Sequence, residues 1–471
     1  MAMSQAANLI EKVLGHGDNA TVTTDVSSYD NEYGVETGEM IQATTWQGKN
    51  RVKVVKMPKP RVIDPGDVIV RVTGSTICGS DLHLYHASGK GVIPQLEKGD
   101  VLGHECCGVV DSIGPEAKNV KVGERVVVSF PIACGDCKNC RREYYSQCDK
   151  THENTLTNAL YGKRTAGKSS RVTGLGGPDI HTKLGTGIFG YSHFTGGFAG
   201  GQAEYIRVPY GDVNLLSIPA EVPDEKALYV SDVIATSWHC VVDTGVKKGD
   251  VVAIWGAGPI GQMCAQFSFF HGASRVILID GGDGAWRLDF VKTKAPKVEL
   301  VNFTNLPKGE SVISQLQKMV DGGPDVALEC AAGEYAKGWA HYFEQMLGME
   351  TDTSELLNEM ITAVRPFGHV GVTGVYAGFT NHFNIGALMQ TGVHLMGNGQ
   401  APVHKYWKHL MHLIQTGDIN PLDMVTHRVR LEDMEKLYAI FNRREMGMQK
   451  VFVQTKHSAP PKHGAPRLTE L

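Results

Sequence analysis

A segment of four closely spaced cysteines is the clearest chemical feature of the sequence. Cys134, Cys137 and Cys140 follow one another with two-residue gaps, and Cys148 comes after a seven-residue gap. Such gaps let a turning backbone aim several thiolates at one point, and zinc prefers four soft ligands in a tetrahedron. The spacing predicts a closed structural zinc site that takes no part in chemistry, with disulfides or an iron–sulfur cluster as the alternatives.

A second set of residues could hold a metal ion that keeps one coordination position open. Cys78 begins the segment Cys-Gly-Ser-Asp-Leu-His at 78–83, and His104 lies in Gly-His-Glu at 103–105, each just past a β-type run. Cysteine and histidine are common ligands of catalytic zinc. A single cysteine and a single histidine are also common core residues, so these residues alone leave both interpretations open.

A glycine pattern further along the chain indicates a dinucleotide site. GxGxxG at 256–261 directly follows the strand-like run 251–255, and Asp280 closes the next β-type run about 20 residues later. Glycines at a helix start let backbone N–H groups approach a pyrophosphate, and the acid suits the adenine ribose hydroxyls of NAD better than a 2′-phosphate. The alternative is a glycine turn without a nucleotide. The motif residues expected to bind NAD are Gly256, Gly258, Pro259, Ile260 and Gly261.

The dinucleotide pattern strengthens the catalytic interpretation of the open metal site. Hydride transfer from an alcohol to NAD needs a Lewis acid that lowers the pKa of the alcohol and a path for its proton. Cys78, His104, Ser80 and His83 supply these residue types. Three other cysteines, Cys240, Cys264 and Cys330, stand in apolar runs and are interpreted as small buried hydrophobic residues.

Length and composition narrow the class of protein. A chain of 471 residues is too long for one hydrophobic core, so we expect two domains. A net charge of −4 without a basic aromatic stretch excludes a nucleic-acid footprint, which leaves a small molecule as the expected partner. The apolar runs are too short to span a bilayer, and no leader pattern is visible. We therefore expect a cytoplasmic protein with no membrane partner.

The pattern of elements predicts how these residues are positioned. Residues 1–40 read as an extension, and 41–128 contain short valine- and isoleucine-rich runs that are typical of a β-rich domain. The stretch 149–201 reads as a long functional loop. From residue 232 onward, apolar β-type runs alternate with helical patterns, which predicts an α/β unit with a parallel sheet. A helix near 405–416 and a strand at 449–453 then precede a proline-rich tail.

Taken together, the motifs resemble those of the zinc-containing medium-chain alcohol dehydrogenases. That family carries Cys-Gly-Ser-Asp-x-His, Gly-His-Glu, a four-cysteine loop and GxGxxG in this order, and the similarity covers roughly residues 41–453. It implies an α/β fold: a GroES-like β-rich catalytic domain and a Rossmann doubly wound parallel-sheet domain. The domains expected from it are an extension at 1–40, a catalytic domain at 41–233 plus 399–456, an NAD-binding domain at 234–398 and a tail at 457–471.

The resemblance also assigns roles to individual residues. It implies that Cys78 and His104 bind catalytic zinc, that Ser80 and His83 relay a proton to solvent, and that Glu105 lies close to the metal. With the four-cysteine loop, two zinc ions per subunit are expected. Asp81 would orient one of the metal-binding side chains without binding the metal itself. Thr236 is expected near the nicotinamide, and Arg287 among the residues that bind the coenzyme.

The third protein ligand departs from the usual pattern of the family. A cysteine is usual before the coenzyme domain, but this chain has Asp232 in the segment 230–236. A lone aspartate before a helix is ordinarily an N-cap. Three segments, however, are similar to the glutathione-independent formaldehyde dehydrogenase branch, in which an aspartate takes the third ligand position, so Asp232 is the predicted ligand. These segments are 195–204, 208–214 and 399–406.

The branch implies NAD-dependent oxidation of hydrated formaldehyde or another small aldehyde or alcohol, and in some members dismutation of the aldehyde with retained cofactor. Departures at 161–186, 281–284 and 333–357 leave a general zinc alcohol or polyol dehydrogenase as the main alternative. A non-catalytic nucleotide-binding sensor or structural protein is the alternative from another class. The family resemblance further implies a homodimer or homotetramer.

Overall fold

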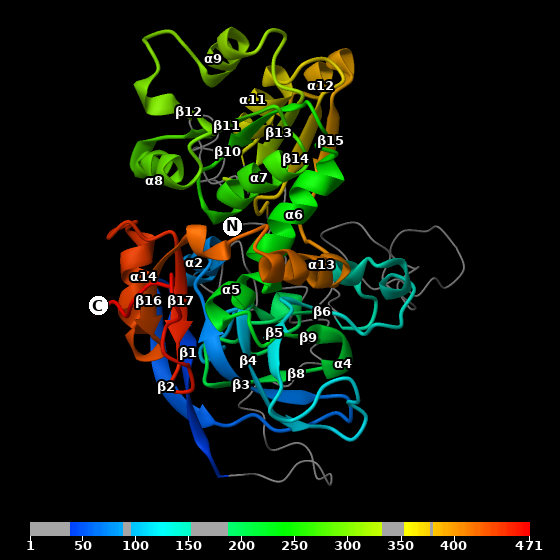
Figure 1. The fold of residues 1–471 in the computed structure, drawn as a ribbon, viewed down its shortest axis with the longest axis vertical. Coiled ribbons are helices and arrows are strands. Elements are labelled where there is room, and N and C mark those ends of the chain that lie inside the picture. The colour runs from blue at the N-terminus through cyan, green and yellow to red at the C-terminus, as the bar shows by residue number, and fades with distance from the viewer. Residues whose placement is uncertain (1–37, 88–95, 152–186, 332–352, 377–379) are drawn as a thin grey trace. The chain divides into compact units, whose positions relative to one another are not determined.

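The structure described is a computed structural model (Figure 1), and the described residues are 38–87, 96–151, 187–331, 353–376 and 380–471. The chain divides into two compact units. The first contains the described residues up to Asp232 with Pro402–Arg443 and Lys450–Leu471, and the second contains Val233–Ala401 and Arg444–Gln449. Residues 1–37 of the predicted extension at 1–40 and most of the predicted loop at 149–201 lie outside the described residues.

A seven-stranded sheet forms the centre of the first unit. Its strands follow the order β16-β17-β3-β4-β5-β9, and β8 pairs with β3. Apart from the parallel pair β16 and β17, neighbouring strands are antiparallel. The strands are β3 (Val68–Ser75), β4 (Cys106–Ile113), β5 (Arg125–Val128), β8 (Tyr205–Val208), β9 (Leu215–Ser217), β16 (Val425–Arg430) and β17 (Lys450–Gln454).

Both faces of this sheet are covered, which explains its continuous apolar runs. On β3, Val68, Val70 and Val72 pack into one buried cluster with residues of β5, whereas Ile69 packs into another with Ile41 of β1. Alternate residues of a strand point to opposite faces, so a strand buried on both sides must be apolar throughout. The valine- and isoleucine-rich runs of the sequence therefore mark buried strands.

Short hairpins and helices complete the first unit. Two-stranded pairs join β1 with β2 and β6 with β7. These strands are β1 (Met40–Gly48), β2 (Arg51–Pro58), β6 (Pro131–Ile132) and β7 (Gly187–Ile188). The helices are α2 (Gly79–His86), α4 (Gly211–Asn214), α5 (Asp224–Ala227), α13 (Val403–Thr416) and α14 (Met434–Asn442), and a 3-10 turn, η4, spans Leu228–Ser231.

The second unit is built on a six-stranded parallel sheet with the order β12-β11-β10-β13-β14-β15. The chain enters this sheet at the central strand β10, adds β11 and β12 on one side and then β13, β14 and β15 on the other, as in a doubly wound fold. The strands are β10 (Val251–Trp255), β11 (Arg275–Asp280), β12 (Glu299–Asn302), β13 (Val326–Glu329), β14 (His369–Val372) and β15 (His394–Gly397). The predicted α/β class with a Rossmann-type parallel sheet is confirmed.

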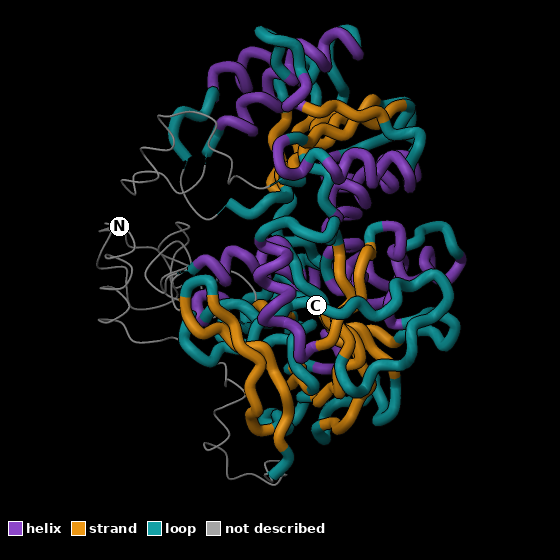
Figure 2. The backbone as a smooth tube through the Cα atoms, turned by 90° about the vertical axis from the view of Figure 1, so that its left-hand side faces the viewer, coloured by secondary structure: helices purple, strands orange, loops and turns teal. Residues whose placement is uncertain are grey.

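Helices cover both faces of the parallel strands (Figure 2). Residues of α9 and α11, among them Leu316 and Met360, pack with Trp255 and Ile279 into one buried cluster. Helices α6 and α7 pack against each other and against strands of the same sheet. The helices are α6 (Val233–Thr244), α7 (Pro259–Phe270), α8 (Trp286–Lys294), α9 (Val312–Met319), α11 (Glu355–Ala363) and α12 (Ile385–Thr391). Within the described ranges, no helix has the length and apolar character needed to cross a bilayer.

Candidate metal and coenzyme sites

The open metal site is positioned by the meeting ends of two paired strands. β3 pairs antiparallel with β4, and Ser75 at the end of β3 is the partner of Cys106 at the start of β4. The Ser75 hydroxyl also donates a hydrogen bond to the Glu105 carbonyl oxygen at 3.1 Å. Cys78 comes three residues after β3, and His104 and Glu105 come directly before β4. The antiparallel register therefore brings segments 78–83 and 103–105 to the same place.

Asp232 adds a second carboxylate, beside that of Glu105, to the open metal site. It follows η4, which is anchored by a hydrogen bond from the Phe130 N–H to the Ser231 carbonyl at 3.2 Å. Asp232 Oδ2 lies 3.2 Å from His104 Nε2, and Glu105 Oε1 lies 3.9 Å from the same nitrogen. The candidate ligand atoms all lie within 4.8 Å of one another, and we call this set the ligand cluster: Cys78, His104, Glu105 and Asp232.

The donor set of the ligand cluster suits zinc. Thiolate, imidazole and carboxylate are its common protein ligands. Glu105 Oε2 is buried and has no hydrogen-bond partner in the described part of the chain, and such an oxygen is costly unless a cation or donor faces it. Cys78 and Asp232 are partly exposed, whereas His104 and Glu105 are buried. The cluster thus combines buried ligands with an accessible side, as a catalytic metal site requires.

A carboxylate behind the cluster, that of Asp81, is held by hydrogen bonds and faces the ring of His104. Asp81 Oδ2 accepts hydrogen bonds from the Cys78 N–H at 2.9 Å and from Gln202 Nε2 at 3.2 Å, and Asp81 Oδ1 lies 3.4 Å from His104 Nδ1. Tyr438 holds the other end of Gln202 by a 2.9 Å hydrogen bond. Burial alone would lower the pKa of His104, but the Asp81 charge and hydrogen bonds with the two aspartates raise it well above its usual value.

Lys450 forms a buried ion pair with Glu105. Lys450 Nζ donates a hydrogen bond to Glu105 Oε1, and the two side chains are 2% and 1% exposed. Burial by itself lowers the pKa of Lys450, yet the charge of Glu105 outweighs it, so this pKa is raised. Burial raises the pKa of Glu105 in spite of Lys450. One carboxylate oxygen of Glu105 is therefore held by lysine, while the other has no protein donor among the described residues.

The two predicted proton-relay residues lie on the helix that starts at the metal site. Ser80 and His83 are one turn apart on α2, and both are half-buried. Residues three apart on a helix share one face. Tyr191 lies close by: its ring is 5.3 Å from the His104 ring, and burial raises the pKa of its phenol although a hydrogen bond with Ser80 lowers it.

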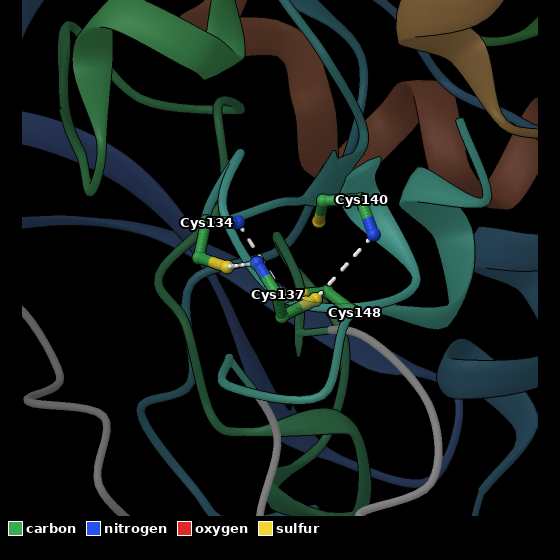
Figure 3. Close-up of side chains that lie close together, drawn as sticks. All are labelled: Cys134, Cys137, Cys140 and Cys148. Carbon is green, nitrogen blue, oxygen red and sulfur yellow. Dashed lines mark hydrogen bonds between the residues drawn. The ribbon is translucent and has the colours of Figure 1, made fainter. Parts of the chain in front are cut away.

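The four predicted structural cysteines converge in one loop (Figure 3). Their Sγ atoms all lie within 4.8 Å of one another, and Cys137 Sγ is 4.0 Å from Cys148 Sγ. Backbone N–H groups donate to the sulfurs, for example from Cys137 to Cys134 Sγ at 3.3 Å and from Cys140 to Cys137 Sγ at 3.4 Å. Such donors stabilise thiolates. All four residues are buried, so the donor set fits a closed tetrahedral zinc site.

The glycine motif adopts the turn that its sequence predicts. It lies between β10 and α7, and Pro259 is the first residue of the helix. Gly256 has φ +104°, and a Cβ on it would lie 2.7 Å from the Cys330 carbonyl oxygen. A Cβ on Gly261 would lie 1.9 Å from the Gly256 carbonyl oxygen. Only glycine fits these two positions, which keeps the N-terminus of α7 open to a phosphate.

Other predicted coenzyme residues lie around this turn or on neighbouring helices. Asp280 ends β11, and its Oδ2 accepts a 2.8 Å hydrogen bond from the Ala257 N–H, which places the carboxylate beside the turn. Arg287 lies in the first turn of α8, with its guanidinium 5.8 Å from the Trp286 ring centre. Thr236 lies half-buried on α6.

Comparison with known proteins agrees with this geometry. The family profile of the alcohol dehydrogenase GroES-like domain matches residues 64–220. A zinc-type alcohol dehydrogenase-like protein of Schizosaccharomyces pombe is 34% identical over 94% of this chain and 97% of its own length. The chain belongs to the zinc-type alcohol dehydrogenase family. It is accordingly a zinc-dependent oxidoreductase with a GroES-like and a Rossmann-type unit, as the sequence motifs predicted.

Two further relatives of this alcohol dehydrogenase-like protein extend the comparison. A glutathione-independent formaldehyde dehydrogenase of Pseudomonas aeruginosa is 30% identical over 88% of this chain and 98% of its own length. The solved structure of the alcohol dehydrogenase TADH from Thermus sp. ATN1 is 29% identical, with a TM-score of 0.67 over 88% of this chain and all of that one. Both matches span nearly the whole of the relatives, so neither reflects a single shared domain.

Sequence reasoning missed two residues of the open site, Lys450 and Tyr191. Lys450 begins a strand that otherwise reads as apolar, and a lysine at the start of a buried strand is a signal for an internal partner. Tyr191 carries no such signal, because it lies far from His104 in the sequence and in no motif with it. Sequence reasoning likewise did not predict that Cys240, Cys264 and Cys330 lie together.

Proposed function

We propose that this chain is an NAD-dependent zinc alcohol dehydrogenase that oxidises a small alcohol by hydride transfer to nicotinamide. The observation that carries the proposal is the ligand cluster, whose thiol, imidazole and carboxylate groups converge within 4.8 Å. A structural or sensor protein that had lost activity would have no need to keep these residues together with the glycine turn.

The ligand cluster supplies the metal chemistry in this proposal. Cys78, His104 and Asp232 would hold the ion, and Asp81 would fix the ring of His104 from behind. Bound zinc supplies a Lewis acid that lowers the pKa of an alcohol hydroxyl. Glu105 keeps one buried oxygen without a protein donor, so it would be a further oxygen ligand available to the ion.

Two residues of α2 would then move the hydroxyl proton. Ser80 is the second residue of α2, two positions after Cys78. His83 lies one turn further along the same helix. This spacing offers a path from the ligand cluster toward solvent, with the hydroxyl of Ser80 accepting the proton and passing it on. Tyr191, which contacts Ser80 and His104, would form part of the wall around the bound alcohol.

NAD is the proposed coenzyme because of the carboxylate beside the glycine turn. Asp280 is fixed there by hydrogen bonds from the N–H groups of Ala257 and Gly281. A carboxylate at this strand end accepts hydrogen bonds from the ribose hydroxyls of NAD and repels the 2′-phosphate of NADP. The second zinc proposed per subunit lies in the four-cysteine loop, where it would be structural.

Formaldehyde is a second candidate substrate, favoured by one specific observation. Asp232 occupies the ligand cluster where most members of the family are expected to have cysteine, and the 30% identical relative in Pseudomonas aeruginosa is a glutathione-independent formaldehyde dehydrogenase. Hydrated formaldehyde presents a hydroxyl just as an alcohol does, so the same residues would serve. Dismutation would follow if the coenzyme stayed bound between two aldehydes. The predicted cytoplasmic location and dimeric or tetrameric state remain predictions.

The test is NADH formation by the purified zinc-loaded protein with NAD and a panel of primary alcohols, secondary alcohols, polyols and formaldehyde. Turnover of alcohols is the expected result. Formate with NADH would favour the formaldehyde dehydrogenase alternative, and equal formate and methanol without net NADH would favour dismutation. No detectable turnover of any substrate, with zinc and NAD both bound, would overturn the proposal in favour of a non-catalytic protein.

A further inference from the structure

Three cysteines of the second unit converge although they are far apart in sequence. Cys240 comes from α6, Cys264 from α7, and Cys330 directly follows β13. Their sulfur atoms all lie within 4.8 Å of one another, and Cys264 Sγ is 3.8 Å from Cys330 Sγ. Cys240 and Cys264 are buried and Cys330 is half-buried, and none of the three is in a disulfide. We call this set the thiol triad.

The surrounding backbone holds the triad in place. Helices α6 and α7 pack side by side, and the Ser237 hydroxyl on α6 donates to the Ile260 carbonyl of α7 at 3.2 Å. The Cys264 thiol donates to the Ser237 carbonyl at 3.6 Å. The Cys330 N–H donates to the Trp255 carbonyl at 2.8 Å, which continues the pairing of β13 with β10. The three sulfurs therefore come from elements that the sheet fixes relative to one another.

The spacing of the sulfurs suits a metal better than a disulfide. A disulfide needs the sulfurs at about 2.05 Å, so the 3.8 Å pair would have to move by nearly 2 Å. Thiolates that share one ion at about 2.3 Å lie roughly 3.8 to 4.0 Å apart. The 3.8 Å between the sulfurs of Cys264 and Cys330 falls in that range, and all three sulfurs lie within 4.8 Å of one another.

We propose that the thiol triad of Cys240, Cys264 and Cys330 is a further metal site, which takes a soft thiophilic cation such as Cu(I) or Cd(II) through three thiolates. Soft thiolate ligands select such ions over harder ones. Binding would tie α6, α7 and the end of β13 together. Because the Cys330 carbonyl adjoins Gly256, the ion would also stabilise the glycine turn.

The test is the metal content of the zinc-loaded full chain after exposure to Cd(II) under a phosphine reductant and subsequent desalting. The sum of zinc and cadmium is the readout, because exchange at the other cysteine site leaves that sum unchanged. The wild type is expected to retain one ion more per chain than Cys264→Ser. Cys330→Ser is expected to lose the same ion. Because Cys330 is only half-buried, this second variant tests the site even if Cys264→Ser fails to fold.

Cys107→Ser is the matched control, because Cys107 is a buried cysteine outside every cysteine cluster described here. It is expected to retain the additional ion. The proposal is overturned if both triad variants bind as much metal as the wild type, or if the additional ion is absent from all proteins. A disulfide within the triad in the protein as isolated would overturn it as well. None of these readouts depends on catalytic activity, so they are independent of the proposed function.

Discussion

Lys450 Nζ donates a hydrogen bond to Glu105 Oε1 inside the first unit, where the two side chains are 2% and 1% exposed. The other oxygen of Glu105, Oε2, is buried and has no protein donor in the described part of the chain. Lys450 therefore compensates a buried carboxylate within the ligand cluster. This relationship links the stability of the unit to the chemistry of the site.

Replacing Lys450 by methionine should be strongly destabilising. The change leaves the Glu105 carboxylate buried without its partner, which typically costs about 3 to 5 kcal/mol. Unfolding in denaturant would measure the loss. Lys318→Met is the control, because Lys318 pairs with Glu310 at the surface with 59% of its side chain exposed, so a change below about 1 kcal/mol is expected. Equal effects of the two substitutions would contradict the role given to Lys450.

Replacing Cys137 by serine should release one zinc ion and lower the melting temperature. Cys137 is buried in the four-cysteine loop, and its sulfur accepts N–H groups of Cys140 and Asp149. Removal of one of four ligands opens a closed site whose binding energy is part of the folding energy. Calorimetry with zinc analysis would measure both effects. Cys107→Ser should keep the full zinc content, and a variant at Cys137 that also kept it would refute the structural site.

Replacing Asp280 by serine should shift the coenzyme preference toward NADP. The carboxylate lies beside the glycine turn, and its removal takes away an acceptor for the ribose and a repulsion for the 2′-phosphate. A charged hydrogen bond of about 1.5 to 3 kcal/mol corresponds to roughly a tenfold or larger loss in kcat/KM with NAD. Asp283→Ser, an exposed acid three residues on, is the control. An unchanged ratio of the two coenzymes would count against the assignment of Asp280.

His404 should remain neutral well into the acid range. Its ring lies 4.8 Å from those of Tyr145 and Trp407, and burial lowers its pKa to about 3. Unfolded histidine binds a proton near 6.5, so the unfolded state takes up more protons below that pH and stability falls as pH drops from 6.5 toward 3. The slope is about 1.4 kcal/mol per pH unit.

The comparison for His404 is the free energy of unfolding of the wild type and of His404→Gln at pH 7 and pH 5. Glutamine keeps a donor for the Asn214 Oδ1, which lies 2.8 Å from His404 Nε2, but does not titrate. The wild type should lose roughly 2 kcal/mol more than the variant over this interval. Parallel losses in the two proteins would show that His404 is protonated in the folded state.

Local sequence patterns predicted the helices and strands whose positions depend mainly on residues close together in the chain. β10 spans the predicted run Val251–Trp255, and α7 begins at Pro259 just after the glycine turn. Both follow from apolar runs and from the backbone freedom of glycine. The predicted closing strand at 449–453 is shifted by one residue, to Lys450–Gln454, because strand ends are set by pairing partners rather than by composition.

Contacts between distant residues could not be predicted in the same way. Lys450 reaches Glu105 across 345 positions, and Cys330 reaches Cys264 across 66. Each of these cysteines, taken alone, sits in an apolar run and reads as an ordinary buried residue. Only the packing of α6, α7 and β13 shows that the three thiols face one another. Motifs with short spacing reveal a site from sequence, whereas sites assembled from separate elements do not.

The central claim is that Asp232 completes an open zinc site that activates the substrate. The most direct measurement is the zinc content and NADH formation of Asp232→Ala beside the wild type, with the exposed Asp321→Ala as control. The account predicts that Asp232→Ala alone loses one zinc ion and that its turnover falls by more than about a hundredfold, since the metal contributes several kcal/mol. Full zinc content and undiminished turnover in Asp232→Ala would contradict it.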